Sequence, residues 1–237
     1  MRKIGVITDV HANLPALEAA LGALEAAGCE EVVHTGDAIG IGPYPAECLD
    51  LLLNRPQTHL LMGNHDALFV TGLPDTQPPW MRGGEYGHQR WTHAQLDAGL
   101  RDVVGAWPYT VGMAFGPARI TFCHYARNPE HAGFASVVMD PSSSDLDQLF
   151  GTDADIVFYG HHHPTTDLQG KSRYINPGSL GCHLLAEARF AILTTDDTGI
   201  RDVSLHAVPY DRARLIRAFR DRDVSGADAI LRMFFGQ

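Results

Sequence analysis

The chain opens on a strand pattern that ends in two polar side chains, KIGVITDVH over residues 3–11. Ile4, Val6 and Ile7 are β-type apolar residues, and Asp9 and His11 follow them closely. This stretch predicts a buried strand with a carboxylate and an imidazole in the loop just past its carboxyl end.

The same pattern returns further along the chain. Apolar, strand-like runs lead into Gly36-Asp37, into Gly63-Asn64-His65-Asp66 and into Gly160-His161-His162-His163. Open α/β sheets collect ligands at the carboxyl ends of their strands, so we expect these clusters to converge. Carboxylate, carboxamide and imidazole groups that converge predict a metal site.

The first part of the chain alternates strand and helix patterns. Leu14, Leu17, Leu21 and Leu24 recur at helical spacing. The predicted elements are a strand at 3–8, a helix at 13–27, a strand at 31–35, a helix at 45–54 and a strand at 59–62. Such a β-α-β-α-β unit predicts a mostly parallel half-sheet.

The remainder is predicted to be richer in strands. We expect an exposed, Pro- and Gly-rich loop at 72–84 and one helix from about 85 to 106. Strands are predicted at 109–112, 119–123 and 155–159, then an antiparallel run at 173–175, 189–194 and 203–207, with helices at 145–150, 211–220 and 227–235. With 237 residues, the chain is expected to form a single domain, 1–237, with an insert at about 68–108.

Composition narrows the classes of function. The 18 basic and 28 acidic residues give a net charge of −10, which argues against long nucleic acids as partners. The cysteines, Cys29, Cys48, Cys123 and Cys182, lack paired spacing, so we expect reduced thiols and a cytoplasmic location. The strand pattern begins at the first residues, so we expect no leader, and no apolar run reaches the ~18 residues of a membrane span. We therefore expect no membrane partner.

The spacing within the clusters suggests a two-metal arrangement. Asp9 and His11, like His161 and His163, stand at positions i and i+2, which point the same way in extended geometry. Asp37 has two carboxylate oxygens and could bridge two cations. Two metals about 3.5–4 Å apart that share this residue and a hydroxide would clamp the attacking and leaving oxygens of a phosphoryl transfer.

A second metal needs further ligands. Asn64 offers a neutral carbonyl oxygen, and His124 follows the predicted strand 119–123 at the same edge. We assign one metal to Asp9, His11, Asp37 and His163, and the other to Asp37, Asn64, His124 and His161. Nitrogen and oxygen ligands without thiolate favour manganese, iron, zinc, nickel or cobalt as the two divalent metal ions.

His65, beside Asn64, is left without a metal. In this interpretation Asp66 orients the His65 ring or favours its protonated form. His65 then donates a proton to the leaving oxygen or a hydrogen bond to a phosphate oxygen. His65 and Asp66 are the predicted catalytic residues.

The order D-x-H, G-D, G-N-H-D, a lone H and G-H-x-H resembles the calcineurin-like metallophosphoesterase superfamily, and most of all its small bacterial and archaeal phosphodiesterase-like branch. Segments 36–45 and 175–181 are similar to ones that recur in that branch. The resemblance implies an α/β (α+β) fold, a four-layer αββα sandwich of two mixed β-sheets flanked by helices. It also implies a metal-dependent phosphoesterase in which metal-bound hydroxide attacks a small phosphorylated substrate, a phosphodiester in the first instance.

The chain departs from the family pattern near the motifs. Tyr125 follows His124 where the family often has Gly, His162 stands where Thr is common, and Cys182-His183-Leu184 replaces a frequent Gln-Pro-Arg. We take Tyr44, Tyr125 and His162 as the candidate substrate contacts.

Several alternatives stay open at this point. The enzyme could be a phosphomonoesterase, a dinucleoside polyphosphate hydrolase or a metal-dependent hydrolase of other esters, and it could be a monomer or a homo-oligomer. If the protein were a non-catalytic metal-binding scaffold, we would expect some of the metal-ligand residues to be replaced. In this sequence all the predicted ligands and His65 are present. A surface or hydrogen-bonding role is the better interpretation for the remaining conspicuous histidines, His88, His93, His131 and His183.

Overall fold

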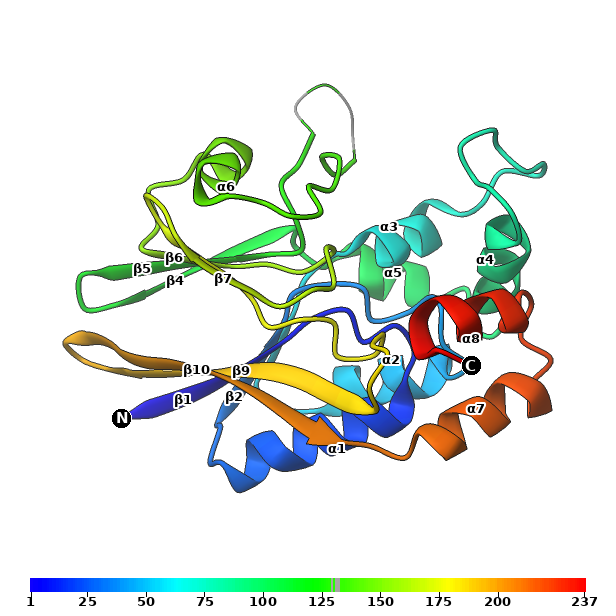
Figure 1. Ribbon diagram of the computed structural model, residues 1–237, viewed down its shortest axis with the longest axis horizontal. Coiled ribbons are helices and arrows are strands. Elements are labelled where there is room, and N and C mark those ends of the chain that lie inside the picture. The colour runs from blue at the N-terminus through cyan, green and yellow to red at the C-terminus, as the bar shows by residue number, and fades with distance from the viewer. Residues whose placement is uncertain (129, 131–132) are drawn as a thin grey trace.

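Two mixed β-sheets pack face to face in the computed structural model, which describes residues 1–128, 130 and 133–237 (Figure 1). The first sheet has the strand order β10-β9-β1-β2-β3 and the second β4-β5-β6-β8-β7. The order shows that strands from both halves of the sequence build each sheet.

The first sheet is built on the N-terminal strands. β1 (Arg2–Ile7), β2 (Glu31–His34) and β3 (Thr58–Leu60) run parallel, and α1 (Leu14–Ala26) and α2 (Pro45–Asn54) connect them. Asn13 caps α1, because its side-chain oxygen accepts from the Ala16 backbone N–H. β9 (Glu187–Asp196) and β10 (Gly199–Pro209) add two antiparallel strands beside β1. The predicted β-α-β-α-β unit is confirmed.

The second sheet repeats the mixture of directions. β5 (Ala118–Cys123), β6 (Ile156–Phe158) and β8 (Arg173–Asn176) run parallel. The antiparallel strands β4 (Thr110–Phe115) and β7 (Thr166–Gln169) form its edges. The carboxyl ends of the parallel strands in both sheets are followed by the polar motifs.

Apolar side chains hold the layers together. Residues such as Val6, Val33, Phe122 and Phe158 are buried between the two sheets. α1 and α2 cover the outer face of the first sheet, and α6 (Ser143–Phe150) covers that of the second, where Leu146 packs near Tyr159 and Tyr174 (Figure 1). The predicted four-layer αββα sandwich is therefore confirmed.

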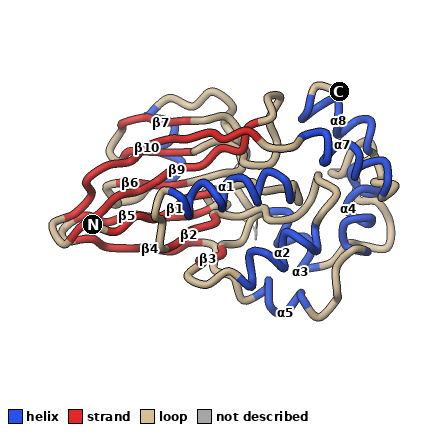
Figure 2. The backbone as a smooth tube through the Cα atoms, turned by 90° about the horizontal axis from the view of Figure 1, so that it is seen from below, coloured by secondary structure: helices blue, strands red, loops and turns tan. Residues whose placement is uncertain are grey.

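The remaining helices gather at one end of the sandwich, away from the N-terminus (Figure 2). They are α3 (Asn64–Thr71), α4 (Glu85–Ala94), α5 (Leu100–Gly105), α7 (Arg212–Asp221) and α8 (Ala227–Phe235). None of the helices in the described residues has the length and apolar character needed to cross a membrane.

The structure corrects several predicted elements. The single helix predicted at 85–106 is in fact two helices, α4 and α5. The chain turns between them, where the Asp97 side chain accepts a hydrogen bond from the Gly99 backbone N–H at 2.7 Å. The predicted antiparallel run is divided, since β8 belongs to the second sheet and β9 and β10 to the first. The strand β7 and the helix α3 were not predicted. As a result, Asn64 and His65 occupy the first turn of a helix rather than a loop.

Candidate metal centre

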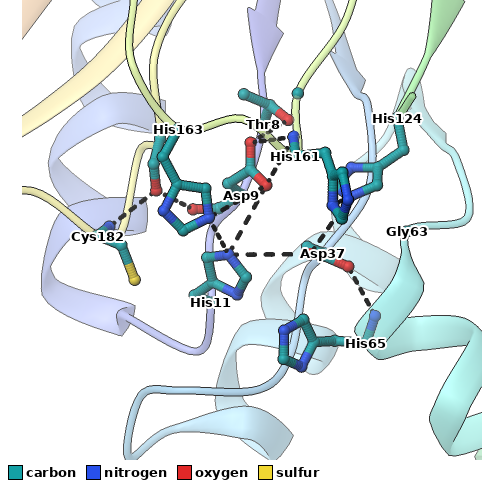
Figure 3. Close-up of polar contacts among 12 residues, drawn as sticks. Thr8, Asp9, His11, Asp37, Gly63, His65, His124, His161, His163 and Cys182 are labelled. Atoms are coloured by element: carbon teal, nitrogen blue, oxygen red, sulfur yellow. Dashed lines mark hydrogen bonds and ion pairs between the residues drawn. The ribbon is translucent and has the colours of Figure 1, made fainter. Parts of the chain in front are cut away.

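The predicted ligands come together where the strands end (Figure 3). The loop after β1 carries Asp9 and His11, the loop after β2 carries Asp37, and the start of α3 after β3 carries Asn64. From the second sheet, the loop after β5 contributes His124, and the loop after β6 contributes His161 and His163. The two sheets thus face each other across one cluster of nitrogen and oxygen atoms.

The first group of donors surrounds Nε2 of His11. This nitrogen lies 2.9 Å from His163 Nε2, 3.7 Å from Asp9 Oδ1 and 3.9 Å from Asp37 Oδ2. His163 Nε2 is also 3.7 Å from Asp9 Oδ1. Two ligands each about 2.1 Å from one tetrahedral metal are about 3.4 Å apart, so the observed spacings bracket the value for a shared cation.

The second group surrounds Nε2 of His124. This nitrogen lies 3.3 Å from Asp37 Oδ2, 3.0 Å from Asn64 Oδ1 and 3.2 Å from His161 Nδ1. Asp37 Oδ2 therefore borders both groups. The other oxygen, Oδ1, accepts the His65 backbone N–H at 2.8 Å, which fixes the direction of the carboxylate.

The backbone of these loops is left-handed. φ is 51° at Asp9, 47° at His11, 60° at Asp37, 66° at His161 and 70° at His163. Each non-glycine residue in this region costs about 1 kcal/mol or more. The extended geometry predicted for the pairs Asp9/His11 and His161/His163 was therefore wrong. Tight turns with a left-handed backbone direct these side chains toward the cluster.

Hydrogen bonds between neighbouring loops hold these strained residues. The Asp9 and His11 backbone N–H groups donate to the Gly36 and Asp37 carbonyls, each at 3.0 Å, and Gly181 N–H donates to the Asp9 carbonyl at 3.0 Å. Gly36 has φ 114°, and a Cβ there would stand 2.7 Å from His124 Nδ1. Only glycine fits the crossing of these loops.

Burial keeps most of the histidines neutral. It lowers the pKa of His11 well below the usual value, lowers the pKa of His161 to about 3, and also lowers that of His163. Neutral imidazole is the form that binds metals.

Asp37 and His124 form a charged pair within this neutral set. Burial by itself would raise the pKa of Asp37, but His124 and His65 offset it and hold that pKa well below its ordinary value. Burial would lower the pKa of His124, yet the Asp37 carboxylate, with Asp9 and Asp66, raises it to about 9. The negative charges of these carboxylates thus favour a positive charge, such as a metal cation, between the two donor groups.

Further contacts orient the donors. His124 Nδ1 lies 3.1 Å from the Thr35 carbonyl and donates to it, which leaves Nε2 toward Asp37. Asp9 Oδ2 accepts from Thr8 Oγ1 at 2.8 Å and from the His161 backbone N–H at 3.1 Å. Such outer contacts fix the orientation and basicity of metal ligands.

Comparison with known proteins identifies the family. A family model, the Calcineurin-like phosphoesterase superfamily domain, matches residues 2–198. The chain belongs to this superfamily. The predicted family and the predicted enzyme class, a hydrolase of phosphoric ester bonds, are confirmed.

Individual proteins are similar to this chain in sequence or in fold. An uncharacterized protein of Methanocaldococcus jannaschii is 26% identical over 196 residues, which are 75% of this chain and 76% of that protein. The crystal structure of a metallophosphoesterase from Sphaerobacter thermophilus has a TM-score of 0.73 at 25% identity and covers 98% of each chain. A hypothetical protein of Pyrococcus horikoshii shares the fold, with a TM-score of 0.82 at 19% identity over 100% of this chain and 99% of that one.

In this phosphoesterase, His65 lies beside the first donor group. Its ring meets the His11 ring edge to face, with centroids 5.1 Å apart. His65 Nδ1 lies 2.8 Å from Nε2 of Gln89, a residue of α4 that is 2% exposed. No motif in the sequence pointed to Gln89.

Asp66 has different partners from those predicted. Its carboxylate oxygens accept backbone N–H groups from Asp37 at 2.7 Å, Ala38 at 3.1 Å and Gly63 at 3.0 Å. The side chain is fully buried. Asp66 therefore ties the β2 loop to the start of α3, while the contact to the His65 ring comes from Gln89.

The candidate substrate contacts are engaged elsewhere. Tyr125 is 2% exposed, and its hydroxyl accepts the Val138 backbone N–H at 3.1 Å. The Tyr44 ring lies under the Arg222 guanidinium, 4.4 Å from its centre. His162 is buried, with Nε2 on the Met139 carbonyl. The structure thus gives each of these residues a contact within the protein, and their role as substrate contacts stays a prediction.

The other conspicuous residues have mixed placements. Cys182 lies near the first group, with its sulfur within 4.8 Å of ring nitrogens of His11 and His163. His88 is buried, with Nδ1 3.1 Å from the Ser225 carbonyl, and His183 Nδ1 accepts the Leu185 backbone N–H. His131 lies outside the described residues.

Proposed function

We propose that this phosphoesterase is a phosphodiesterase that uses two divalent metal ions. The observation that carries the proposal is the position of Asp37 Oδ2, 3.9 Å from Nε2 of His11 in one donor group and 3.3 Å from Nε2 of His124 in the other. A carboxylate oxygen that lies between two sets of nitrogen and oxygen donors is suited to bridge two cations.

The donor set supports this fit. His11 Nδ1 is buried without a hydrogen-bond partner among the described residues, while its Nε2 faces the cluster. One metal would be held by Asp9, His11, Asp37 and His163, and the other by Asp37, Asn64, His124 and His161. These nitrogen and oxygen donors suit manganese, iron, zinc, nickel or cobalt. Bound divalent metals would act as Lewis acids on phosphoryl oxygens and lower the pKa of water.

His65 supplies the proton for the leaving oxygen. Gln89 Nε2 lies 2.8 Å from His65 Nδ1 and donates to it when the ring is neutral. The form that gives up a proton is the imidazolium ring, whose Nδ1–H would donate to the Gln89 amide oxygen once that amide turns, and neutral imidazole is left after the transfer from Nε2. The His65 backbone N–H donates to Asp37 Oδ1, which ties this residue to the proposed bridging carboxylate. A general acid in this position contributes roughly 10²–10⁴-fold to turnover.

The choice of diester over monoester rests on the resemblance to the phosphodiesterase-like branch. The net charge of −10 supports a small phosphorylated substrate over long nucleic acid. A panel of chromogenic esters, bis(p-nitrophenyl) phosphate against p-nitrophenyl phosphate, separates the two activities. A higher kcat/KM for the monoester would replace the diester assignment.

Metal analysis with two variants tests the mechanism. Wild type should bind two metals per chain, Asp37→Ala should lose both, and His65→Ala should keep both metals but lose most of its turnover. Asp102→Ala, which removes an exposed carboxylate on α5, is the matched control. Full occupancy in Asp37→Ala would exclude the bridging role, and wild-type turnover in His65→Ala would exclude the proton donor.

A further inference from the structure

A pocket of about 390 Å³ lies between the start of α4 and one side of α8. These helices belong to distant parts of the chain but are neighbours at the same end of the molecule (Figure 1). On the α4 side the lining runs from Arg82 to Gln89, and on the α8 side it includes Ile230, Met233 and Phe234. Its volume is within the range of sites for small organic molecules.

The pocket adjoins the reacting groups. His65 itself lines it, as does Gln89, which holds the His65 ring. Phe234 also lines it, and its ring centroid is 5.9 Å from that of the predicted metal ligand His163. A molecule in this pocket would therefore lie beside the proton donor and next to the first donor group.

The lining is mainly apolar. Ile41, Ile230, Met233 and Phe234 contribute aliphatic, thioether and aromatic surface. Met233 is 69% exposed, although a large apolar side chain gains free energy when a partner covers it. Apolar side chains at the rim of a pocket that adjoins reactive groups are typical of a ligand site.

We propose that this pocket binds the organic group that departs with the leaving oxygen. The preferred substrates are then phosphate esters whose leaving alcohol carries an apolar, ring-sized group, and α8 sets this preference. The inference rests on the proposed function, because His65 can protonate the leaving oxygen only if the attached group lies on its side of phosphorus. The adjacency of His65 to the pocket supplies that placement.

Two diesters that differ only in the leaving group provide the test. Methyl p-nitrophenyl phosphate releases an aryl alcohol, whereas methyl 2,2,2-trifluoroethyl phosphate releases a two-carbon alcohol, and both keep the same methyl ester. The informative variant is Ala229→Trp, because Ala229 is exposed, lines the pocket and can take a large side chain without disturbing the core. The matched control is Arg232→Trp, since Arg232 is exposed on the same helix but outside the pocket lining.

Ala229→Trp should lower kcat/KM for the aryl diester about tenfold or more, because the bulky indole occupies the space of the ring. The same variant should change kcat/KM for the trifluoroethyl diester less than about twofold, and Arg232→Trp should leave both values unchanged. An equal loss on both substrates, or no loss on either, would overturn the proposal.

A binding measurement separates this inference from the proposed function. Calorimetric titration of free p-nitrophenol should show binding to wild type and at least about tenfold weaker binding to Ala229→Trp. If wild type hydrolyses neither diester but binds p-nitrophenol in this way, the diesterase activity is refuted and the pocket stands. If p-nitrophenol binds both proteins equally, the pocket assignment is refuted whatever the turnover.

Discussion

Gln89 and His65 form a part-buried hydrogen bond, 2.8 Å between the amide Nε2 and the ring Nδ1. The amide N–H donates, so the acceptor nitrogen of the neutral ring is Nδ1 and the proton lies on Nε2. Gln89 lies in α4 and is 2% exposed, and both residues also line the pocket beside α8. The pair fixes the direction of the proposed proton donor, and the Gln89 amide can also accept from Nδ1–H of the imidazolium form through its oxygen.

Replacement of Gln89 by Leu should lower kcat roughly 10–100-fold, because the ring loses the contact that sets its direction. Metal content should stay close to wild type, since the Gln89 amide bonds to His65 and to none of the predicted ligands among the described contacts. Steady-state kinetics and metal analysis check this outcome. The matched variant is Gln95→Leu, at an exposed glutamine just past the same helix, and an unchanged kcat in Gln89→Leu would refute the positioning role.

Two glycines with similar backbone conformations offer a second test. Gly40 has φ 84°, and a Cβ there would collide with the His65 ring. Gly28 has φ 77° and nothing within 4 Å of its Cβ position. Gly40→Ala and Gly28→Ala should each lower the free energy of unfolding by about 1 kcal/mol, owing to the positive φ. Only Gly40→Ala should lose turnover.

Urea unfolding and diester hydrolysis measure the two effects separately. An equal loss of turnover in both glycine variants would mean that backbone strain, and not displacement of His65, limits activity. If turnover were unchanged in Gly40→Ala, the His65 ring could move away from the new Cβ without loss of activity.

The sequence could predict which polar side chains converge at the sheet edges because their positions depend on local signals. A strand that ends in Asp9 or Asp37 delivers that side chain to the edge of the sheet whatever the rest of the chain does. The order of the motifs then identified the family and the sandwich. What the local signals did not contain was the left-handed backbone, because those turns are stabilised by hydrogen bonds from other loops.

Local sequence patterns could not predict the residues that hold the site residues in place. Asp66 was assigned to His65 because the two are adjacent, but they lie in the first turn of α3, where neighbouring side chains point about 100° apart. His65 accordingly faces the pocket and Asp66 the β2 loop. Gln89 and Phe234 reach the site only through the packing of α4 and α8, which no motif encodes.

The contacts of Asp66 predict a mainly structural role. Asp66→Ala would leave the buried backbone N–H groups of Asp37, Ala38 and Gly63 without their acceptor, which should lower the free energy of unfolding by about 3–5 kcal/mol. Urea unfolding of the metal-free protein gives this value. Asp102→Ala, at an exposed position, should change it by less than about 0.5 kcal/mol. A variant as stable as wild type but inactive would restore the catalytic role.

His34 makes the stability of the metal-free protein depend on pH. It is fully buried in β2, neither ring nitrogen has a hydrogen-bond partner in the described part of the chain, and burial lowers its pKa to about 3. In the unfolded chain this histidine has a pKa near 6.5, so it binds a proton between about pH 6.5 and pH 3, whereas in the folded chain it stays neutral over that range. The stabilising contribution of neutral His34 is therefore complete above about pH 6.5 and is lost progressively as the pH falls toward 3.

His34→Leu should remove this part of the pH dependence. Between pH 6 and pH 5 the free energy of unfolding of wild type should fall about 1 kcal/mol more than that of the variant, because one pKa unit corresponds to about 1.4 kcal/mol. The buried histidines of the metal centre remain in both proteins, so the difference isolates His34. His206→Leu, at an exposed histidine of β10, should keep the wild-type slope. Parallel curves for wild type and His34→Leu would show that His34 takes up a proton in the folded protein.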